Sequence, residues 1–196
     1  ESDSGPAPAD GAFPVTVDTK FGEGTIESAP ERVAALGWGD AETALALGVQ
    51  PVAASDWLAF GGDGVGPWAQ GLYDSPPELI GTIEPSFELL AAQTPDLILD
   101  TKSSGEQARY ETLSGIAPTV AGPEGSDAYL TSLDDQVTSV AAALGVPDKG
   151  AELLSQIDAD FEQAAADNPG FAGKTVTVAS YTSEGWGAYV VGDSRV

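Results

Sequence analysis

Three residue types are absent from this chain of 196 residues: cysteine, histidine and methionine. Without cysteine there is no disulfide bridge and no thiol nucleophile, and without histidine a Ser-His-Asp triad cannot form. The same absences remove the usual ligands of zinc and copper. We therefore expect no catalytic residue of these classes, no metal site and no intrinsic cofactor.

Basic residues are the next shortage. Seven Lys and Arg stand against thirty-one Asp and Glu, which gives a formal net charge of −24. A surface of this sign repels phosphate backbones and anionic lipid headgroups. Nucleic-acid binding is therefore excluded, and the acidic surface is typical of a solvated, secreted protein.

Long apolar runs are also missing. No stretch approaches the roughly 20 apolar residues that a membrane span requires, and no signal peptide remains. We expect a soluble chain whose only membrane attachment is a lipid anchor upstream of Glu1.

The amino-terminal region has two parts. Residues 1–12 mix Ser, Gly, Pro, Ala and acids without apolar periodicity, which predicts a flexible acidic tether. Past Phe13, apolar residues alternate on both sides of a Gly-containing turn at 21–24, and this pattern predicts a hairpin.

A strand-helix unit then recurs. Residues 32–36 are predicted as a strand, followed by a short helix with Asp40 as its N-cap and Gly48 at its end, and by a strand from Val52. In the next unit Ser86 is the expected cap of a helix.

The apolar strand at 97–99 shows no alternation, which implies a sheet covered on both faces. A helix at 106–113 and a strand at 119–120 follow. Residues 13–126 therefore predict a three-layer, Rossmann-like α/β lobe that binds a ligand.

Two amphipathic helices are predicted after this lobe, in a connecting helical segment at 127–167. The first rests on Leu130, Leu133, Val137, Val140, Ala141 and Leu144, and the second on Leu153, Leu154, Ile157 and Phe161.

Residues 175–179 predict one more buried strand. A single strand cannot bury a core, so we expect residues 168–196 to be the truncated start of a carboxyl-terminal lobe. The predicted fold class is α/β: a Rossmann-like N-terminal lobe, a long connecting helix and the first strand of an incomplete second α/β lobe.

Four stretches resemble a known family in their order and spacing. They are RVAALGW from Arg32, ALGVQPV from Ala46, GTIEPSFE from Gly81 and PDLIL from Pro95. The series is similar to the iron-siderophore and cobalamin branch of ABC-transporter substrate-binding proteins over about residues 13–120, and the long helix that follows resembles the rigid helix that joins the two lobes in that family.

The resemblance implies a function in iron transport. The protein would be extracytoplasmic, either periplasmic or a cell-surface lipoprotein. It would capture an iron(III)-siderophore, its transported ligand, between two lobes and deliver it to an ABC transporter permease without chemistry.

In this family the ligand is contacted by loops at the carboxyl ends of strands. The corresponding loops here are 37–40, 55–70, 101–105 and 181–187. They contain Trp38, Trp57, Trp68, Tyr181 and Trp186. Tryptophan in polar, Gly-rich loops is poorly explained by core packing, so we predict that these residues bind ligand.

A strongly acidic protein that binds an anionic siderophore complex needs a local cation. Lys102, directly after the strand 97–100, is the first candidate and Arg109 is the second. Ser103 lies in the same loop and is expected to donate a hydrogen bond. If the ligand is neutral or cationic, Lys102 has no role and the aromatic contacts dominate.

Glu88 matches a family glutamate that pairs with arginines of the permease, so the resemblance implies a docking role. Its counterpart in the second lobe would lie beyond Val196. The alternative is that a carboxylate in the first helical turn is favourable through the helix dipole alone.

Two alternatives stay open. Cobalamin or haem is carried by other members of the same family, although the absence of histidine weakens haem. A secreted hydrolase would instead use a carboxylate pair, such as Asp56 with Asp63 or Asp100 with Glu106.

Overall fold

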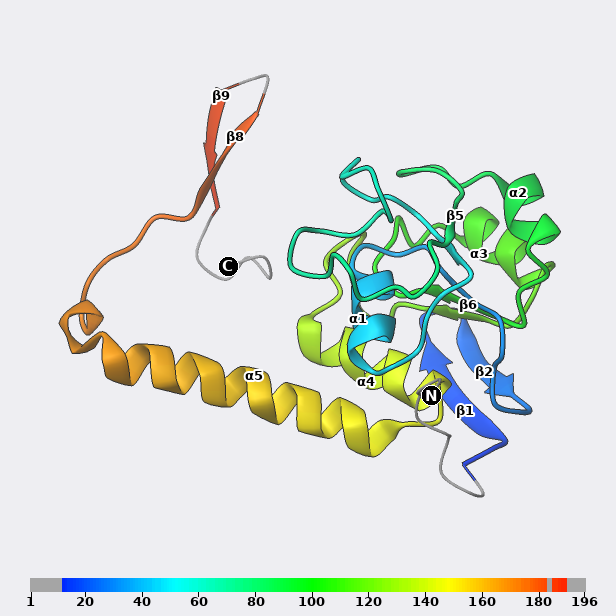
Figure 1. The fold of residues 1–196 in the computed structure, drawn as a ribbon, viewed down its shortest axis with the longest axis horizontal. Coiled ribbons are helices and arrows are strands. Elements are labelled where there is room, and N and C mark those ends of the chain that lie inside the picture. Colours follow the sequence, from blue (N-terminus) through cyan, green and yellow to red (C-terminus); the bar gives the residue numbers. More distant parts are fainter. Residues whose placement is uncertain (1–11, 183–184, 190–196) are drawn as a thin grey trace. The chain divides into compact units, whose positions relative to one another are not determined.

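The computed structural model describes residues 12–182 and 185–189. The chain divides into two compact units, Glu1–Leu153 and Leu154–Val196, and the division falls within helix α5 (Pro147–Asp167; Figure 1). Nearly all of the predicted acidic tether at 1–12 lies outside the described residues.

A five-stranded parallel sheet forms the centre of the first unit. Its order is β5 (Glu78–Leu79), β4 (Ala53–Ala54), β3 (Val33–Ala35), β6 (Leu97–Asp100) and β7 (Thr119–Ala121). From β3 the chain moves outward to β4 and β5, then returns to β6 on the opposite side of β3. The strand order therefore reverses between β3 and β6, as in a doubly wound fold.

Both faces of this sheet are covered, as the lack of alternation predicted. Val33, Leu97 and Leu99 share a core cluster with helices α1 (Asp40–Ala46) and α4 (Leu133–Ala143). Ala34 and Ile98 face a second cluster with α2 (Phe87–Ala92) and α3 (Gln107–Ser114). The prediction of a three-layer α/β lobe is confirmed.

The helix caps agree with prediction in one case and differ in another. Ser86 caps α2 by accepting a hydrogen bond from Leu89 N. The predicted cap Asp40 is instead the first residue of α1, behind Gly39 with φ of 77°, and its carboxylate is buried in the lobe. The two-residue strand β5 was not predicted, because an edge strand this short carries no pattern.

The predicted hairpin is formed by β1 (Val15–Thr19) and β2 (Gly22–Ile26), which pair antiparallel. Its turn falls at Lys20 and Phe21, slightly earlier than predicted. Val17 and Ile26 belong to the same core cluster as the α1 and α4 side of the sheet.

Helix α4 is part of the first lobe, which corrects the prediction that it is the connecting helix. Val140, Ala141 and Leu144 pack in one cluster with Leu97 of the central strand. The helix is also shorter than predicted, since Leu130 precedes the capping residue Ser132. The 21-residue helix α5 is the one that runs on into the second unit.

The second unit contains the rest of α5, the 3-10 turn η1 (Pro169–Phe171), and the antiparallel strands β8 (Ala179–Thr182) and β9 (Gly185–Ala188). The predicted buried strand at 175–179 is wrong. Residues 174–178 form no strand, and Val176 is 80% exposed. A buried parallel strand requires neighbours on both sides, and the described part of this unit offers only the hairpin. Among the described residues, no helix has both the length and the apolar character needed to cross a membrane.

Candidate functional site

Two loops meet where the strand order reverses. The segments that follow β3 and β6 stay hydrogen-bonded to each other. Leu36 N donates to Leu99 O at 2.8 Å, and Trp38 N donates to Lys102 O at 2.9 Å. A Cβ on Gly37 would lie 2.3 Å from Asp40 Oδ2, so only glycine fits between the loops. In doubly wound folds this switch point is where ligands bind.

Five aromatic rings form a continuous row at this edge of the sheet, here called the aromatic row. In order they are Tyr129, Trp38, Trp57, Phe60 and Trp68, and consecutive ring centroids lie 4.6, 5.6, 5.4 and 5.7 Å apart. Their loops follow β3, β4 and β7. Trp68 is 68% exposed and the other four are partly buried. The structure thus brings together the three tryptophans predicted for this lobe.

Tyr129 and Phe60 were missed by the sequence analysis. Tyr129 is held beside Trp38 because its N–H donates to Ser103 O at 2.8 Å. Its φ of 60° is unusual for a bulky residue, and such outliers concentrate at functional sites. The rule that found the tryptophans, an aromatic residue in a loop after a strand, would also have found Tyr129.

Carboxylates shape the loop that carries the rest of the row. Trp57 Nε1 donates to Glu42 Oε1 at 3.1 Å, and Gly66 N donates to the same oxygen at 3.3 Å. Asp56, which is buried, accepts from Phe60 N at 2.7 Å and from Gly61 N. Asp56 was one member of a hydrolase pair in the sequence analysis, and its two oxygens are already engaged by the backbone.

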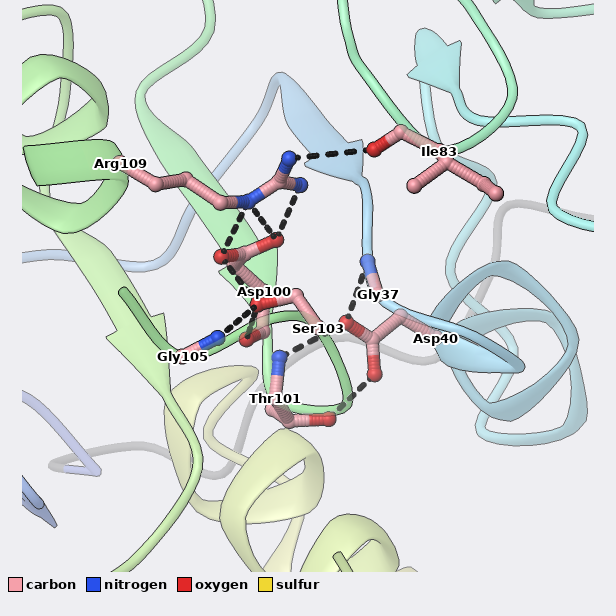
Figure 2. A network of polar contacts seen from close by, with 8 residues as sticks. All are labelled: Gly37, Asp40, Ile83, Asp100, Thr101, Ser103, Gly105 and Arg109. Atoms are coloured by element: carbon pink, nitrogen blue, oxygen red, sulfur yellow. Dashed lines mark hydrogen bonds and ion pairs between the residues drawn. The ribbon is translucent and has the colours of Figure 1, made fainter. Parts of the chain in front are cut away.

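Asp40 lies at the centre of a buried polar network (Figure 2). One carboxylate oxygen accepts from Gly37 N and Thr101 N, both at 3.0 Å, and the other accepts from the Thr101 hydroxyl and from Gln136 Nε2. Gln136 Nε2 also donates to Trp38 O at 2.8 Å. Asp40 and Gln136 therefore join the loops that present Trp38 and Lys102.

Burial raises the pKa of Asp40 to about 6, although hydrogen bonds from Thr101 and Gln136 oppose the shift. Lys102 is partly buried beside this network. Burial lowers the pKa of the Lys102 amino group, and the charge of Asp40 acts in the opposite direction. The predicted cation therefore lies beside the Asp40 network at this edge of the sheet, and its contact with a ligand stays a prediction.

Arg109 of α3 and Ser103 of the Lys102 loop belong to a second buried network (Figure 2). Arg109 Nη2 lies 2.7 Å from Asp100 Oδ1, and Arg109 Nη1 donates to Ile83 O. Ser103 Oγ donates to Asp100 Oδ2 at 2.7 Å. Burial opposes ionisation, but Asp100 raises the pKa of Arg109 above its ordinary value, so the guanidinium stays charged. Both side chains brace the loop of Lys102, and direct contact of either with a ligand stays a prediction.

The remaining predicted residues lie elsewhere. Tyr181 and Trp186 are paired across the β8–β9 hairpin with centroids 5.2 Å apart, and both are exposed. Glu88 is exposed in the first turn of α2. Their roles in ligand binding and docking stay predictions.

One hollow of the first unit lies away from this site. A cavity of about 400 Å³ lies between the β1–β2 hairpin, β7 and the end of α3, and none of the predicted site residues lines it. Within the described residues, no three carboxylate, His or Cys side chains are grouped so that they could hold a metal ion.

A doubly wound lobe with an aromatic surface at its switch point defines a ligand-binding protein of the α/β class. Residues 33–196 match the model of the periplasmic binding protein family, and the chain belongs to this family. The resemblance drawn from the sequence is therefore confirmed. Members of this family are binding proteins.

Individual relatives agree. The chain is 32% identical over 179 residues to the "Probable siderophore-binding lipoprotein YfiY" of Bacillus subtilis. This alignment covers 87% of this chain and 48% of that protein. A periplasmic solute binding protein of Mycobacterium smegmatis is 34% identical with a TM-score of 0.84, covering 91% of this chain and 64% of that one. PiaA of Streptococcus pneumoniae, solved in complex with ferrichrome, is 29% identical with a TM-score of 0.74, covering 87% and 59%. The chain thus spans about half the length of the curated relative that it matches.

Proposed function

We propose that the protein containing this chain binds a ferric siderophore and delivers it to an ABC importer. The aromatic row at the switch point carries the proposal, because it offers an organic ligand a continuous surface of ring faces and edges. The names of the relatives support it: YfiY is described as siderophore-binding, and PiaA was solved with ferrichrome.

The chemistry of a siderophore complex fits this surface. The iron arrives coordinated by the siderophore's own oxygen atoms, so the protein has to recognise an organic shell and does not need to ligate the metal. The aromatic row would contact that shell, and the amino group of Lys102 would provide an electrostatic contact at its edge. No bond forms or breaks in this function.

Delivery requires a partner and a location. Glu88 is exposed beside the cap of α2, where a permease arginine could pair with it. We also propose an extracytoplasmic location with a lipid anchor, which the family and the lipoprotein relative support. Both belong to the proposal.

Ligand titration with tryptophan fluorescence tests the proposal. The full-length protein that contains this chain would be titrated with ferrichrome, with a ferric tris(catecholate) and with cobalamin. We expect saturable quenching by a ferric siderophore and a loss of about tenfold or more in affinity for Trp57→Ala, which corresponds to about 1.4 kcal/mol.

The matched control is Leu89→Ala, which removes an exposed apolar side chain on α2, outside the aromatic row, and should leave the affinity unchanged. Saturable quenching by cobalamin alone would replace the siderophore with a different ligand of the family. Absence of binding by every ferric complex would refute the proposal.

A further inference from the structure

The charges around the aromatic row are unbalanced. Three carboxylates lie directly against it: Asp40 beneath the Trp38 loop, Glu42 on the indole of Trp57, and Asp56 on the backbone of Phe60. In the part of the chain that the structure describes, the only ion pair is Arg109 with Asp100. The hydrogen bonds to these three carboxylates all come from neutral donors.

Among the described residues, two amino groups bring positive charge close to the row, fewer than the three carboxylates. Lys102 is adjacent, through its backbone bond to Trp38. Arg109 is neutralised by Asp100 at 2.7 Å. Lys20, on the β1–β2 turn, provides the second amino group: its Nζ lies against Gly105, at the end of the Lys102 loop, and 5.5 Å from the ring of Phe21. The surface that this lobe offers to a ligand is thus net negative.

The aromatic rings add to the negative electrostatic potential of this surface. The face of an aromatic ring carries negative electrostatic potential and attracts cations, so it gives an anionic complex no compensation. Farther out, a chain with a net charge of −24 slows the approach of anions, and this effect is screened beyond a Debye length of about 8 Å at physiological salt.

Siderophore classes differ in the charge of their ferric complexes. Three hydroxamate groups, each a monoanion, bring iron(III) to neutrality, and an additional amine makes the complex cationic. Three catecholate groups, each a dianion, leave a complex with three negative charges. The charge of the surface therefore discriminates between them.

We infer that this lobe selects ferric complexes without net negative charge, of the tris(hydroxamate) class, over trianionic tris(catecholate) complexes. The inference rests on the proposed function and narrows its ligand. On this basis the aromatic contacts provide most of the affinity, and the electrostatic contact of Lys102 contributes the smaller part.

The test compares two dissociation constants in the full-length protein, one for ferrichrome as the neutral tris(hydroxamate) and one for a ferric tris(catecholate). We expect ferrichrome to bind at least about tenfold more tightly. Its affinity should change little with salt, whereas that of the tris(catecholate) should improve as salt screens the repulsion.

A charge variant makes the test specific to the row. Glu42→Gln keeps an oxygen acceptor for Trp57 and Gly66 but removes one negative charge. It should reduce the preference for ferrichrome over the tris(catecholate), measured as the ratio of the two constants, by about threefold to fivefold. Glu162→Gln, on the exposed surface of α5, makes the same change in total charge and should leave the ratio unchanged.

The outcomes distinguish a failure of the charge inference from a failure of the proposed siderophore binding. Tighter binding of the tris(catecholate) than of ferrichrome would overturn the charge inference and leave siderophore binding intact. Equal effects of Glu42→Gln and Glu162→Gln would overturn the assignment of selectivity to the row. Failure of both complexes to bind would overturn the proposed function, and the inference with it.

Discussion

The substitution Asp40→Asn should alter how the stability of the protein depends on pH. Asp40 is fully buried, and its pKa is raised from 3.8 to about 6 because burial penalises the charged form. The folded state therefore holds the Asp40 proton more tightly than the unfolded state does. This contribution to stability is fully present below pH 4 and is lost as the pH rises through 6.

The magnitude follows from the shift. About two pKa units correspond to about 3 kcal/mol in the free energy of unfolding, gained between pH 7 and pH 4. Asparagine has the same shape but no proton to exchange, so the variant lacks this term. The amide nitrogen of asparagine is itself a donor, and in either orientation it would face N–H or O–H donors. The unsatisfied donors should lower the free energy of unfolding by about 1–3 kcal/mol at every pH.

The assay is urea unfolding of both proteins, followed by tryptophan fluorescence at a series of pH values from 4 to 7. The wild type should gain about 3 kcal/mol relative to Asp40→Asn as the pH falls. The other carboxylates are common to both proteins and cancel. Asp158→Asn, on the exposed surface of α5, is the control and should show no pH-dependent difference. A constant difference between wild type and Asp40→Asn would refute the argument, and so would a difference that grows toward pH 7.

Three further substitutions test packing and capping by urea unfolding. Arg109→Leu leaves the Asp100 carboxylate buried without its cation and should cost about 3–5 kcal/mol, so a loss below about 1 kcal/mol would contradict the ion-pair assignment. The buried hydroxyl of Tyr73 has no partner among the described residues, so Tyr73→Phe should lie within about 1 kcal/mol of wild type or be more stable. A larger loss would reveal a bond to that hydroxyl. Ser86→Ala removes the acceptor of Leu89 N and should cost about 1 kcal/mol, whereas Ser86→Asp should retain the cap. Equal losses in both would exclude a capping role.

Local patterns were sufficient for much of the first unit. The apolar run at β6 predicted a strand buried on both faces, and Ser86 predicted the start of α2. Such signals work because burial on both faces and helix capping leave their mark on consecutive residues. They failed at residues 175–179, where only Ala179 belongs to a strand, at the start of the antiparallel β8–β9 hairpin.

The candidate site was only partly predictable. Placing tryptophans in loops after strands indicated Trp38, Trp57 and Trp68, but not that their rings form one row with Phe60 and Tyr129. Helix α4 was predicted as a helix, yet its place against the sheet depends on packing with residues from β1 and β6.

By itself, then, the sequence determined the α/β fold of the first lobe, the exclusion of thiol and triad chemistry, the acidic surface and the aromatic loops. The tertiary structure decided which residues meet. Asp40 bonds to Thr101 and Gln136, which are 61 and 96 positions away, and Arg109 is paired with Asp100 inside the lobe. These contacts depend on the order of the strands and on the packing of α4. Neither leaves a local pattern, because hydrophobic periodicity records which face of an element is buried and not which element covers it.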